Sequence, residues 1–267
     1  RDILKIIFEG PQEELTATQN TQPSLFIVES IIADILNEKG ITPSFTIGHS
    51  LGEYSALYAA GVLSFADGLK AVARRGEYMA KAGKSSPGTM AAVMGLSKDK
   101  ISEVLKKVTS GVVVSANENT PEQTVISGEV PAVNEACTLL KEAGAKRAIV
   151  LPVSGAFHSP LMQSAADEFS QILDLLTFSA PRCPVITNVT AKPETDPQLM
   201  KNLLVKQLVS PVRWVDSMNS LVSRNYGTCI EVGPGSVLKG LAKKCQDALN
   251  VISCDTVTNI YSLLTKS

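Results

Sequence analysis

Residues 42–54 read TPSFTIGHSLGEY, and this stretch decides the fold. The apolar residues before Gly48 predict the end of a short buried strand, and LGEYSALYAAG from Leu51 onward predicts a helix. Between them, residues 48–52 fit the G-x-S-x-G elbow, a tight strand-to-helix turn that both flanking glycines let close. We therefore expect an exposed Ser50 hydroxyl at the start of a helix, where unpaired N–H groups such as that of Leu51 stabilise developing negative charge.

The elbow makes Ser50 a candidate nucleophile. The motif alone is weak because it also arises by chance, but a strand before it and a helix after it favour this interpretation. A serine hydroxyl needs a base, and the chain has two histidines. The side chain of His49 should point away from Ser50, so His158 in GAFHSP is the candidate base by elimination. The alternative is that His158 is a hydrogen-bonded structural histidine with no catalytic role.

The group that orients the His158 imidazole stays open at this point. The nearest carboxylates, Asp167 and Glu168, fall in the following helix, where we expect them to be exposed. A backbone carbonyl, or an amide such as Asn188 or Gln207, would serve instead.

Two further motifs carry possible chemistry. Arg74 and Arg75 are adjacent on a predicted helix, so only one of them points toward the core, and a solvated face is the simpler explanation for either. The sequence GPG at residues 233–235 precedes a helix and would suit a phosphate, although such loops are more often plain strand-to-helix connections.

The segments around the elbow predict an α/β fold. A helix that starts at Thr21-Gln22-Pro23 and ends near Gly40 precedes it, and another follows Ser64. Residues 87–152 then predict the order βαββαβ, the split-βαβ unit of a ferredoxin-like subdomain. We expect residues 1–86 and 153–267 to form an α/β hydrolase-like core with a parallel sheet, and residues 87–152 to be inserted into it.

Composition excludes several classes of protein. With 25 basic and 26 acidic residues and a net charge of −1, nothing indicates nucleic-acid or membrane binding, and the apolar runs are too short to span a bilayer. The five cysteines show no zinc-type spacing, which predicts small buried side chains in a reducing compartment and no metal site.

With these residues in view, the chain resembles the malonyl-CoA:acyl carrier protein transacylases and the acyltransferase domains of polyketide and fatty acid synthases. The resemblance runs nearly end to end, and GHSLGEY followed by GAFH is its most specific part. The other matching stretches are TQPSL, RRGEYM, GTMAAVMGL, SANENTPEQTVISG, AGAKRAIVLPVSGAFHSPLM, VKQLVSPVRW and EVGPGSVLKGL.

The resemblance implies roles for particular residues. It places the acylated serine on Ser50, the catalytic histidine on His158 and the histidine-supporting glutamine on Gln207. It places the carboxylate-binding arginine on Arg75. The remaining assignments are one oxyanion contact at the Leu51 N–H and substrate binding at Phe157 and Asn117.

The resemblance also implies the reaction. The malonyl group of malonyl-CoA would pass to Ser50 and then to the phosphopantetheine thiol of acyl carrier protein, in fatty acid synthesis, with no cofactor beyond the coenzyme A thioester substrate. A guanidinium at Arg75 would pair with the malonyl carboxylate and disfavour neutral acyl groups. GAFH, with Phe157, resembles the malonyl-selective form of the family.

One departure stands against the resemblance. The family opens with a strand and a GQGSQ-like loop whose glutamine supplies a second oxyanion contact, and no stretch here matches it. We expect the chain as written to be poorly active alone, since one lost oxyanion donor costs on the order of a hundred- to a thousandfold in rate. Equal turnover by this chain and by one extended upstream would contradict that expectation.

Two other interpretations remain. A serine hydrolase or thioesterase shares the elbow, but its histidine usually lies near the C-terminus, and a truncated inactive form that only binds acyl carrier protein is the non-catalytic alternative. We expect a monomer in the cytoplasm, or in a mitochondrial or plastid matrix if the source is eukaryotic.

Overall fold

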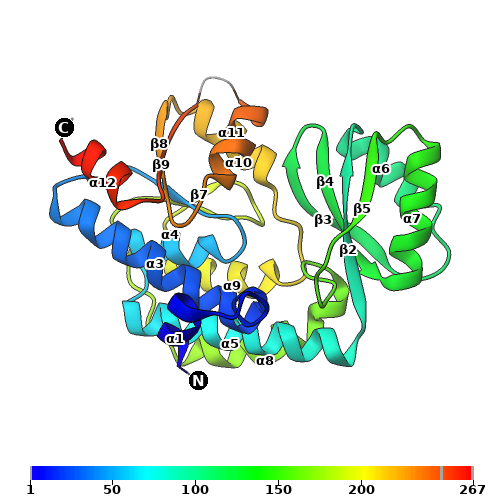
Figure 1. The fold of residues 1–267 in the computed structure, drawn as a ribbon, viewed down its shortest axis with the longest axis horizontal. Helices are drawn as coiled ribbons and strands as arrows, with labels where there is room; N and C mark the ends of the chain where they lie inside the picture. The colour runs from blue at the N-terminus through cyan, green and yellow to red at the C-terminus, as the bar shows by residue number, and fades with distance from the viewer. Residues whose placement is uncertain (1, 247–248, 266–267) are drawn as a thin grey trace.

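The computed structural model describes residues 2–246 and 249–265. Figure 1 shows a mixed α/β fold with a larger, mainly helical part on the left and a four-stranded sheet with two helices on the right. None of the described helices combines the length and the apolar character that a bilayer-spanning segment needs.

The larger part holds most of the helices and several short strands. Its helices are α1 (Ile3–Glu9), α2 (Gln12–Thr16), α3 (Thr18–Glu38), α4 (Gly52–Ala59), α5 (Phe65–Ser85), α8 (Gln163–Asp174), α9 (Pro197–Gln207), α10 (Trp214–Val222), α11 (Val237–Cys245) and α12 (Val257–Leu264), with a 3-10 turn at Pro160–Met162. Its strands are β1 (Thr46–Ile47), β6 (Val185–Ile186), β7 (Pro193–Glu194), β8 (Thr228–Val232) and β9 (Asn250–Cys254).

These strands form two small sheets. β1 pairs in parallel with β6, to which β7 adds antiparallel, while β8 and β9 form a separate parallel pair. A groove of about 720 Å³ lies between β1 and β8, with α3, α4 and α10 also lining it. Parallel pairing is therefore present where we expected a parallel sheet, but the described strands are short and are divided between two sheets.

The part on the right of Figure 1 follows the predicted βαββαβ order. Its elements are β2 (Gly88–Met94), α6 (Lys98–Leu105), β3 (Val113–Thr120), β4 (Gln123–Glu129), α7 (Val130–Glu142) and β5 (Arg147–Val150). The spatial order is β3-β4-β2-β5, and every neighbouring pair is antiparallel.

Alternation along β2 explains how this sheet packs. Ala91 and Val93 contact the cluster formed by α6 and α7, whereas Met90 and Ala92 belong to a second cluster on the other face. Because successive strand residues point to opposite faces, one strand supplies both clusters. Phe157 packs against the second cluster and also against the core of the larger part, so it joins the two.

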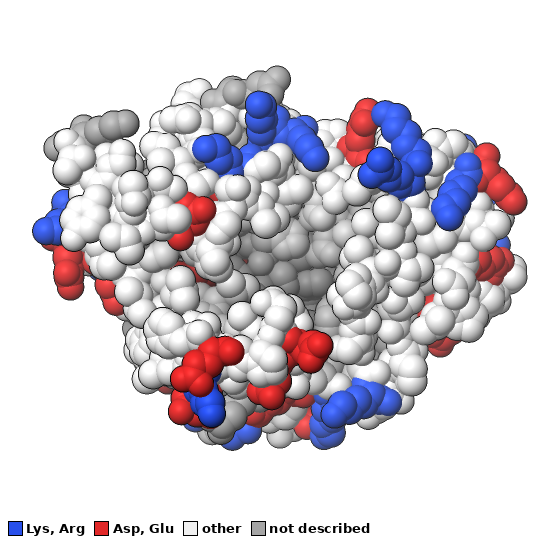
Figure 2. Space-filling model, viewed as in Figure 1, with Lys and Arg blue, Asp and Glu red and all other residues white. Residues whose placement is uncertain are grey.

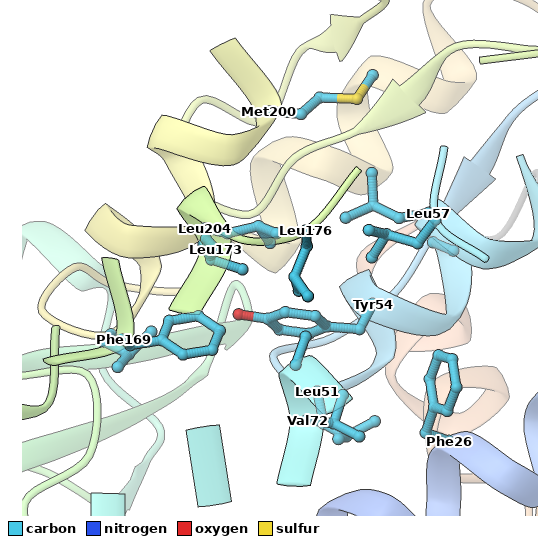
Figure 3. Packing of buried hydrophobic residues seen from close by; sticks show 14 of the residues in the cluster. Phe26, Leu51, Tyr54, Leu57, Val72, Phe169, Leu173, Leu176, Met200 and Leu204 are labelled. Carbon is cyan, nitrogen blue, oxygen red and sulfur yellow. The ribbon is translucent and has the colours of Figure 1, made fainter. Parts of the chain in front are cut away.

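The core of the larger part lies around Tyr54 on α4. Its ring is fully buried, and Figure 3 shows it among apolar side chains from several elements, with Phe169 of α8 near its hydroxyl end and Val72 of α5 on another side. The Tyr54 and Phe169 ring centroids are 6.1 Å apart. The helix that carries the elbow is thus fixed by burial immediately behind Ser50.

The predicted start of the long helix before the elbow is wrong. α3 begins at Thr18, so Pro23 lies inside the helix and not in its first turn. Gly76 of α5 explains the earlier start, because a Cβ there would lie 2.8 Å from the Gln19 Cα. The first turn of α3 therefore packs directly on α5, and this contact holds the segment helical despite the lost backbone bond at the proline.

Candidate active site

The elbow between β1 and α4 has the predicted shape. Ser50 has φ of 53°, in the left-handed region, which costs a residue with a side chain about 1 to 3 kcal/mol and is typical of strained functional turns. A side chain at Gly48 would overlap the Gly52 carbonyl, so this glycine is required. Our expectation for the second glycine is wrong, because a Cβ at Gly52 meets no described atom within 4 Å.

The Ser50 hydroxyl has two polar neighbours from distant parts of the chain. Its Oγ lies 2.8 Å from His158 Nε2 and accepts a hydrogen bond of 3.0 Å from Arg75 Nη2. The structure therefore brings the predicted nucleophile, base and cation together at one oxygen atom.

His158 lies in the loop before the turn at residues 160–162 and is 3% exposed. Its Nδ1 is 2.8 Å from the Gln207 backbone oxygen, which only accepts, so Nδ1 carries the proton and the Nε2 lone pair faces Ser50. Burial, and then the positive charge of Arg75, lower the pKa of His158 to about 3. The imidazole is consequently a neutral acceptor for the serine proton at physiological pH.

Arg75 projects inward from α5 and is 1% exposed. Its Nη1 donates to Gln22 Oε1 at 2.7 Å and its Nη2 to Gln207 Oε1 at 2.9 Å. Within residues 2–246 and 249–265 no carboxylate lies within ion-pair distance of it, and burial lowers the pKa of Arg75. A buried guanidinium with neutral partners alone is ready to receive an anion.

Arg74 confirms the prediction that only one of the two arginines points inward. Its Nη1 forms a surface ion pair of 2.7 Å with Glu77, one turn along α5. Because adjacent helix positions differ by about 100° in direction, the inward position falls to Arg75.

Gln207, at the end of α9, connects these groups. Its backbone oxygen accepts from His158, which answers the open question of what orients the imidazole. Its side-chain Nε2 donates to the Ser50 backbone oxygen at 3.0 Å and to Glu53 Oε2 at 2.6 Å. The imidazole is therefore held by a main-chain carbonyl, with no described carboxylate in that position.

The other predicted residues lie around this centre. The N–H of Leu51 has no hydrogen-bond partner among the described residues, as an oxyanion donor requires. Phe157 is half-buried beside His158, with its ring against Gly155. Asn117 lies on β3, where it bridges to Val212, and within the described chain its side chain has no hydrogen bond to the reacting groups. The substrate-binding roles of Phe157 and Asn117 stay predictions.

His49 points away from the serine, as predicted. Its Nε2 lies 2.9 Å from Asn119 Oδ1 on β3, and its ring is 5.4 Å from that of Trp214. The residue beside the nucleophile thus ties the elbow to the neighbouring sheet.

Two buried polar residues of this site, Gln22 and Glu53, were not predicted from the sequence. Gln22 holds Arg75, and Glu53 accepts hydrogen bonds from Gln207 and from the Asn188 backbone. Both lie inside stretches that carry the resemblance, TQPSL and GHSLGEY, so those motifs were the available indication.

The GPG loop offers no open phosphate site. The Glu231 carboxylate accepts from the backbone N–H groups of Leu238 at 2.8 Å and Lys239 at 3.0 Å, so it occupies the first turn of α11. The plain strand-to-helix connection is the better explanation. Among the described residues, no three or more His, Cys, Asp and Glu side chains are arranged to hold a metal ion.

Comparison with known proteins agrees with this geometry. Residues 2–261 match the family model described as an acyl transferase domain. The chain belongs to this family. It is 47% identical over 250 residues to a malonyl CoA-acyl carrier protein transacylase of Bacillus subtilis strain 168, and the match covers 93% of this chain and 79% of that protein.

Two solved structures of the acyl transferase family are similar over the whole fold. An acyl carrier protein S-malonyltransferase from Vibrio cholerae O1 biovar eltor matches with a TM-score of 0.95 at 40% identity, over 98% of this chain and 86% of that chain. A malonyl-transacylase in complex with a type II PKS acyl-carrier protein matches with a TM-score of 0.96 at 37% identity, over 100% and 87% of the two chains.

Proposed function

We propose that this acyltransferase moves a malonyl group from malonyl-CoA to the phosphopantetheine thiol of acyl carrier protein, in fatty acid synthesis, through a malonyl ester on Ser50. The observation that carries the proposal is the meeting of Ser50 Oγ with His158 Nε2 at 2.8 Å and Arg75 Nη2 at 3.0 Å. A nucleophile, a neutral base and an unpaired buried cation suit an acyl group that ends in a carboxylate.

In the first half-reaction His158 Nε2 takes the hydroxyl proton as Ser50 Oγ attacks the thioester carbon. Negative charge develops on the carbonyl oxygen, and the free N–H of Leu51 at the start of α4 stabilises it. As the tetrahedral intermediate collapses, the carbon–sulfur bond breaks and the imidazolium returns the proton to the coenzyme A thiolate. Malonyl-Ser50 and coenzyme A result.

In the second half-reaction the thiol of the carrier protein attacks the ester carbon of malonyl-Ser50. His158 removes the thiol proton and gives it to Ser50 Oγ as the carbon–oxygen bond breaks. The same oxyanion position serves both steps. Because coenzyme A leaves before the carrier-protein thiol reacts with the acyl-serine, the reaction follows a ping-pong mechanism.

Arg75 supplies the selectivity for malonyl. A malonyl carboxylate forms a charge-assisted, two-pronged pair with the guanidinium, whereas acetyl leaves that buried charge unpaired. Gln22 and Gln207, which hold the guanidinium at 2.7 and 2.9 Å, fix its orientation without neutralising it. Discrimination therefore comes mainly from the penalty that a neutral acyl group incurs.

The same proposal includes the architecture. We assign the parallel strands of the larger part to an α/β hydrolase-like core made of residues 1–86 and 153–267. The four-stranded sheet of residues 87–152, with its β3-β4-β2-β5 order, is assigned to a ferredoxin-like subdomain. Figure 2 shows a hollow on the surface between the left-hand and right-hand parts. This division gives the substrate an open approach between the two units.

The test follows the malonyl label. The chain is incubated with radiolabelled malonyl-CoA, and the adduct is located by peptide mass spectrometry before holo acyl carrier protein is added. We expect a stable ester on Ser50, transfer of the label to the carrier protein, and no adduct with Ser50→Ala. Label released only to water would indicate a hydrolase, and unchanged carrier-protein binding without any adduct would indicate a non-catalytic protein.

A further inference from the structure

The Asn188 side chain bridges two backbone groups of the elbow. Asn188 follows β6 and is fully buried. Its Oδ1 accepts from the Ser50 N–H at 2.7 Å, and its Nδ2 donates to the Gly48 carbonyl at 2.7 Å. One planar carboxamide therefore contacts the residue before His49 and the residue after it.

The backbone of Asn188 is itself anchored on both sides. Its N–H donates to Glu53 Oε2 at 3.1 Å, and its carbonyl accepts from the Arg213 N–H at 3.1 Å. Glu53 is 1% exposed and also accepts from Gln207. Because groups from α4 and from the segment before α10 hold its main chain, the carboxamide has little freedom to follow a shift of the elbow.

These bonds act where the backbone is strained. With Ser50 at φ of 53°, the direction of its side chain depends on the peptide planes before and after this residue, and the Ser50 N–H lies in the first of them. By holding the Ser50 N–H and the Gly48 carbonyl, the bridge fixes the two peptide planes that lead into Ser50 and so helps to aim Oγ at His158 Nε2. It also occupies the Ser50 N–H, which leaves the Leu51 N–H as the free donor beside the nucleophile among the described residues.

We propose that Asn188 is a positioning residue for acyl transfer: its carboxamide holds the Ser50 N–H and the Gly48 carbonyl at once, and so keeps the nucleophile in line with its base. It contacts no substrate and acts through Ser50. The inference rests on the proposed function as far as malonyl transfer is concerned. The bridge should also affect the reaction of Ser50 with any other electrophile, whether or not it carries a malonyl group.

The test uses Asn188→Asp, which keeps the shape of the side chain. An aspartate oxygen still accepts from the Ser50 N–H, but when ionised it repels the Gly48 carbonyl that the amide N–H₂ would contact. We expect the single-turnover rate constant for malonylation of Ser50 to fall about 100-fold at about pH 8. The apparent KM for malonyl-CoA should stay within about threefold of that of the unsubstituted chain, because misplacement of a reacting group lowers the rate more than it weakens binding.

Protonation of the carboxyl group in Asn188→Asp restores the missing donor. Burial favours the protonated acid, so we expect the defect to shrink to within about fivefold at about pH 5. His158, with its pKa of about 3, stays neutral over this range. Among the described residues, the other charged and titratable groups around the elbow are His49, Glu53 of α4, Arg75 of α5 and Arg213. Glu53, with its pKa of about 7, titrates within this range in both proteins, so each rate is compared with that of the unsubstituted chain at the same pH.

Thr187→Val is the matched control. Thr187 is the adjacent residue and is equally buried, but its hydroxyl lies 2.8 Å from Thr190 Oγ1 and takes no part in the elbow. We expect this variant to lose some thermal stability and to keep the acylation rate. Equal slowing by Thr187→Val and Asn188→Asp would overturn the proposal, because it would show a general loss of structure.

A second reagent separates this inference from the function. A fluorophosphonate reacts with an activated serine, forming the phosphorus–oxygen bond with loss of fluoride, and needs no malonyl recognition. We expect Asn188→Asp to lower the rate of this labelling at about pH 8 by about the same factor as the rate of malonylation. The labelling rate should recover at about pH 5. A chain that labels in this way but never takes up malonyl would refute the function and leave the bridge supported.

Two results overturn the proposal outright. One is a fluorophosphonate labelling rate for Asn188→Asp that is within about threefold of the rate for the unsubstituted chain at about pH 8. The other is a slowed labelling rate that does not recover at about pH 5. Should Asn188→Asp fail to fold, Asn188→Ser, which removes the bridge without adding charge, gives the same rate comparison with both reagents.

Discussion

At the scale of single residues, one oxygen atom organises the site. Ser50 Oγ meets His158 on one side and Arg75 on the other, and no described carboxylate supports the imidazole. An imidazolium next to the Arg75 charge would be disfavoured in the resting protein, which adds to the effect of burial in keeping the pKa of His158 so low. If a malonyl carboxylate pairs with Arg75 as we propose, that repulsion weakens, and we expect substrate binding itself to make His158 a better base.

Arg75→Ala tests this arrangement. We expect kcat/KM for malonyl-CoA to fall about 100- to 1000-fold, because a charge-assisted pair with the substrate is lost. The preference for malonyl-CoA over acetyl-CoA should fall by a similar factor. The measurement is competitive acylation of Ser50 from an equimolar mixture of the two thioesters. Arg74→Ala, which removes the neighbouring surface guanidinium, is the control and should keep the preference. An unchanged preference in Arg75→Ala would remove this residue from substrate recognition.

At the scale of elements, the contact between α3 and α5 holds the arginine in place. Gly76 follows Arg75 directly, and only a hydrogen at this position fits against the first turn of α3, at Thr18 and Gln19. Gln22, one turn further along α3, then reaches Arg75 Nη1. The close approach of the two helices and the hydrogen bond to the guanidinium therefore depend on each other.

Gly76→Ala tests this dependence. A methyl group 2.8 Å from the Gln19 Cα meets rigid backbone, so we expect the free energy of unfolding to fall by about 1 to 3 kcal/mol. The KM for malonyl-CoA should rise as well, because the separated helices loosen the hold on Arg75. Denaturant unfolding and steady-state kinetics measure the two effects.

Gly240→Ala is the control for the same chemical change in a helix. Gly240 lies in α11, and a Cβ there meets no described atom within 4 Å. Alanine should raise the free energy of unfolding by up to about 1 kcal/mol through helix propensity and leave KM unchanged. If Gly76→Ala behaved in the same way, the close approach of α3 and α5 would not matter to the site.

At the scale of the whole molecule, stability is coupled to the ionisation of the active site. Glu53 is buried beneath the elbow, and burial raises its pKa to about 7 against the opposing effects of its hydrogen bonds and Arg75. The folded state thus binds this proton more tightly than the unfolded state does. The contribution to stability is complete below about pH 4.5 and is lost as the pH rises through about 7.

Glu53→Gln should remove this pH dependence, because an amide oxygen accepts the same bonds without titrating. We expect the free energy of unfolding of the variant, relative to the unsubstituted chain, to rise by roughly 3 kcal/mol between about pH 5 and about pH 8. Denaturant titrations of both proteins across this range provide the measurement. Parallel pH curves would show that Glu53 ionises as freely in the folded state as in the unfolded chain.

The sequence by itself determined the local features of this protein. Residues 48–52 predicted the elbow, and the sequence pattern predicted the βαββαβ order of residues 87–152. The direction of adjacent helix positions predicted that one arginine points inward. These features follow from short-range sterics and burial, which a few neighbouring residues specify.

Only the tertiary structure decided which distant groups meet. Three such contacts join segments far apart in the chain. A backbone carbonyl of Gln207 orients His158, Gln22 holds Arg75, and Asn188 bridges the elbow. The early start of α3 had the same origin, because packing against Gly76 outweighed the preference of Pro23 for a first turn. Hydrogen bonds and close packing between elements are fixed by the whole fold, so no local pattern encodes them.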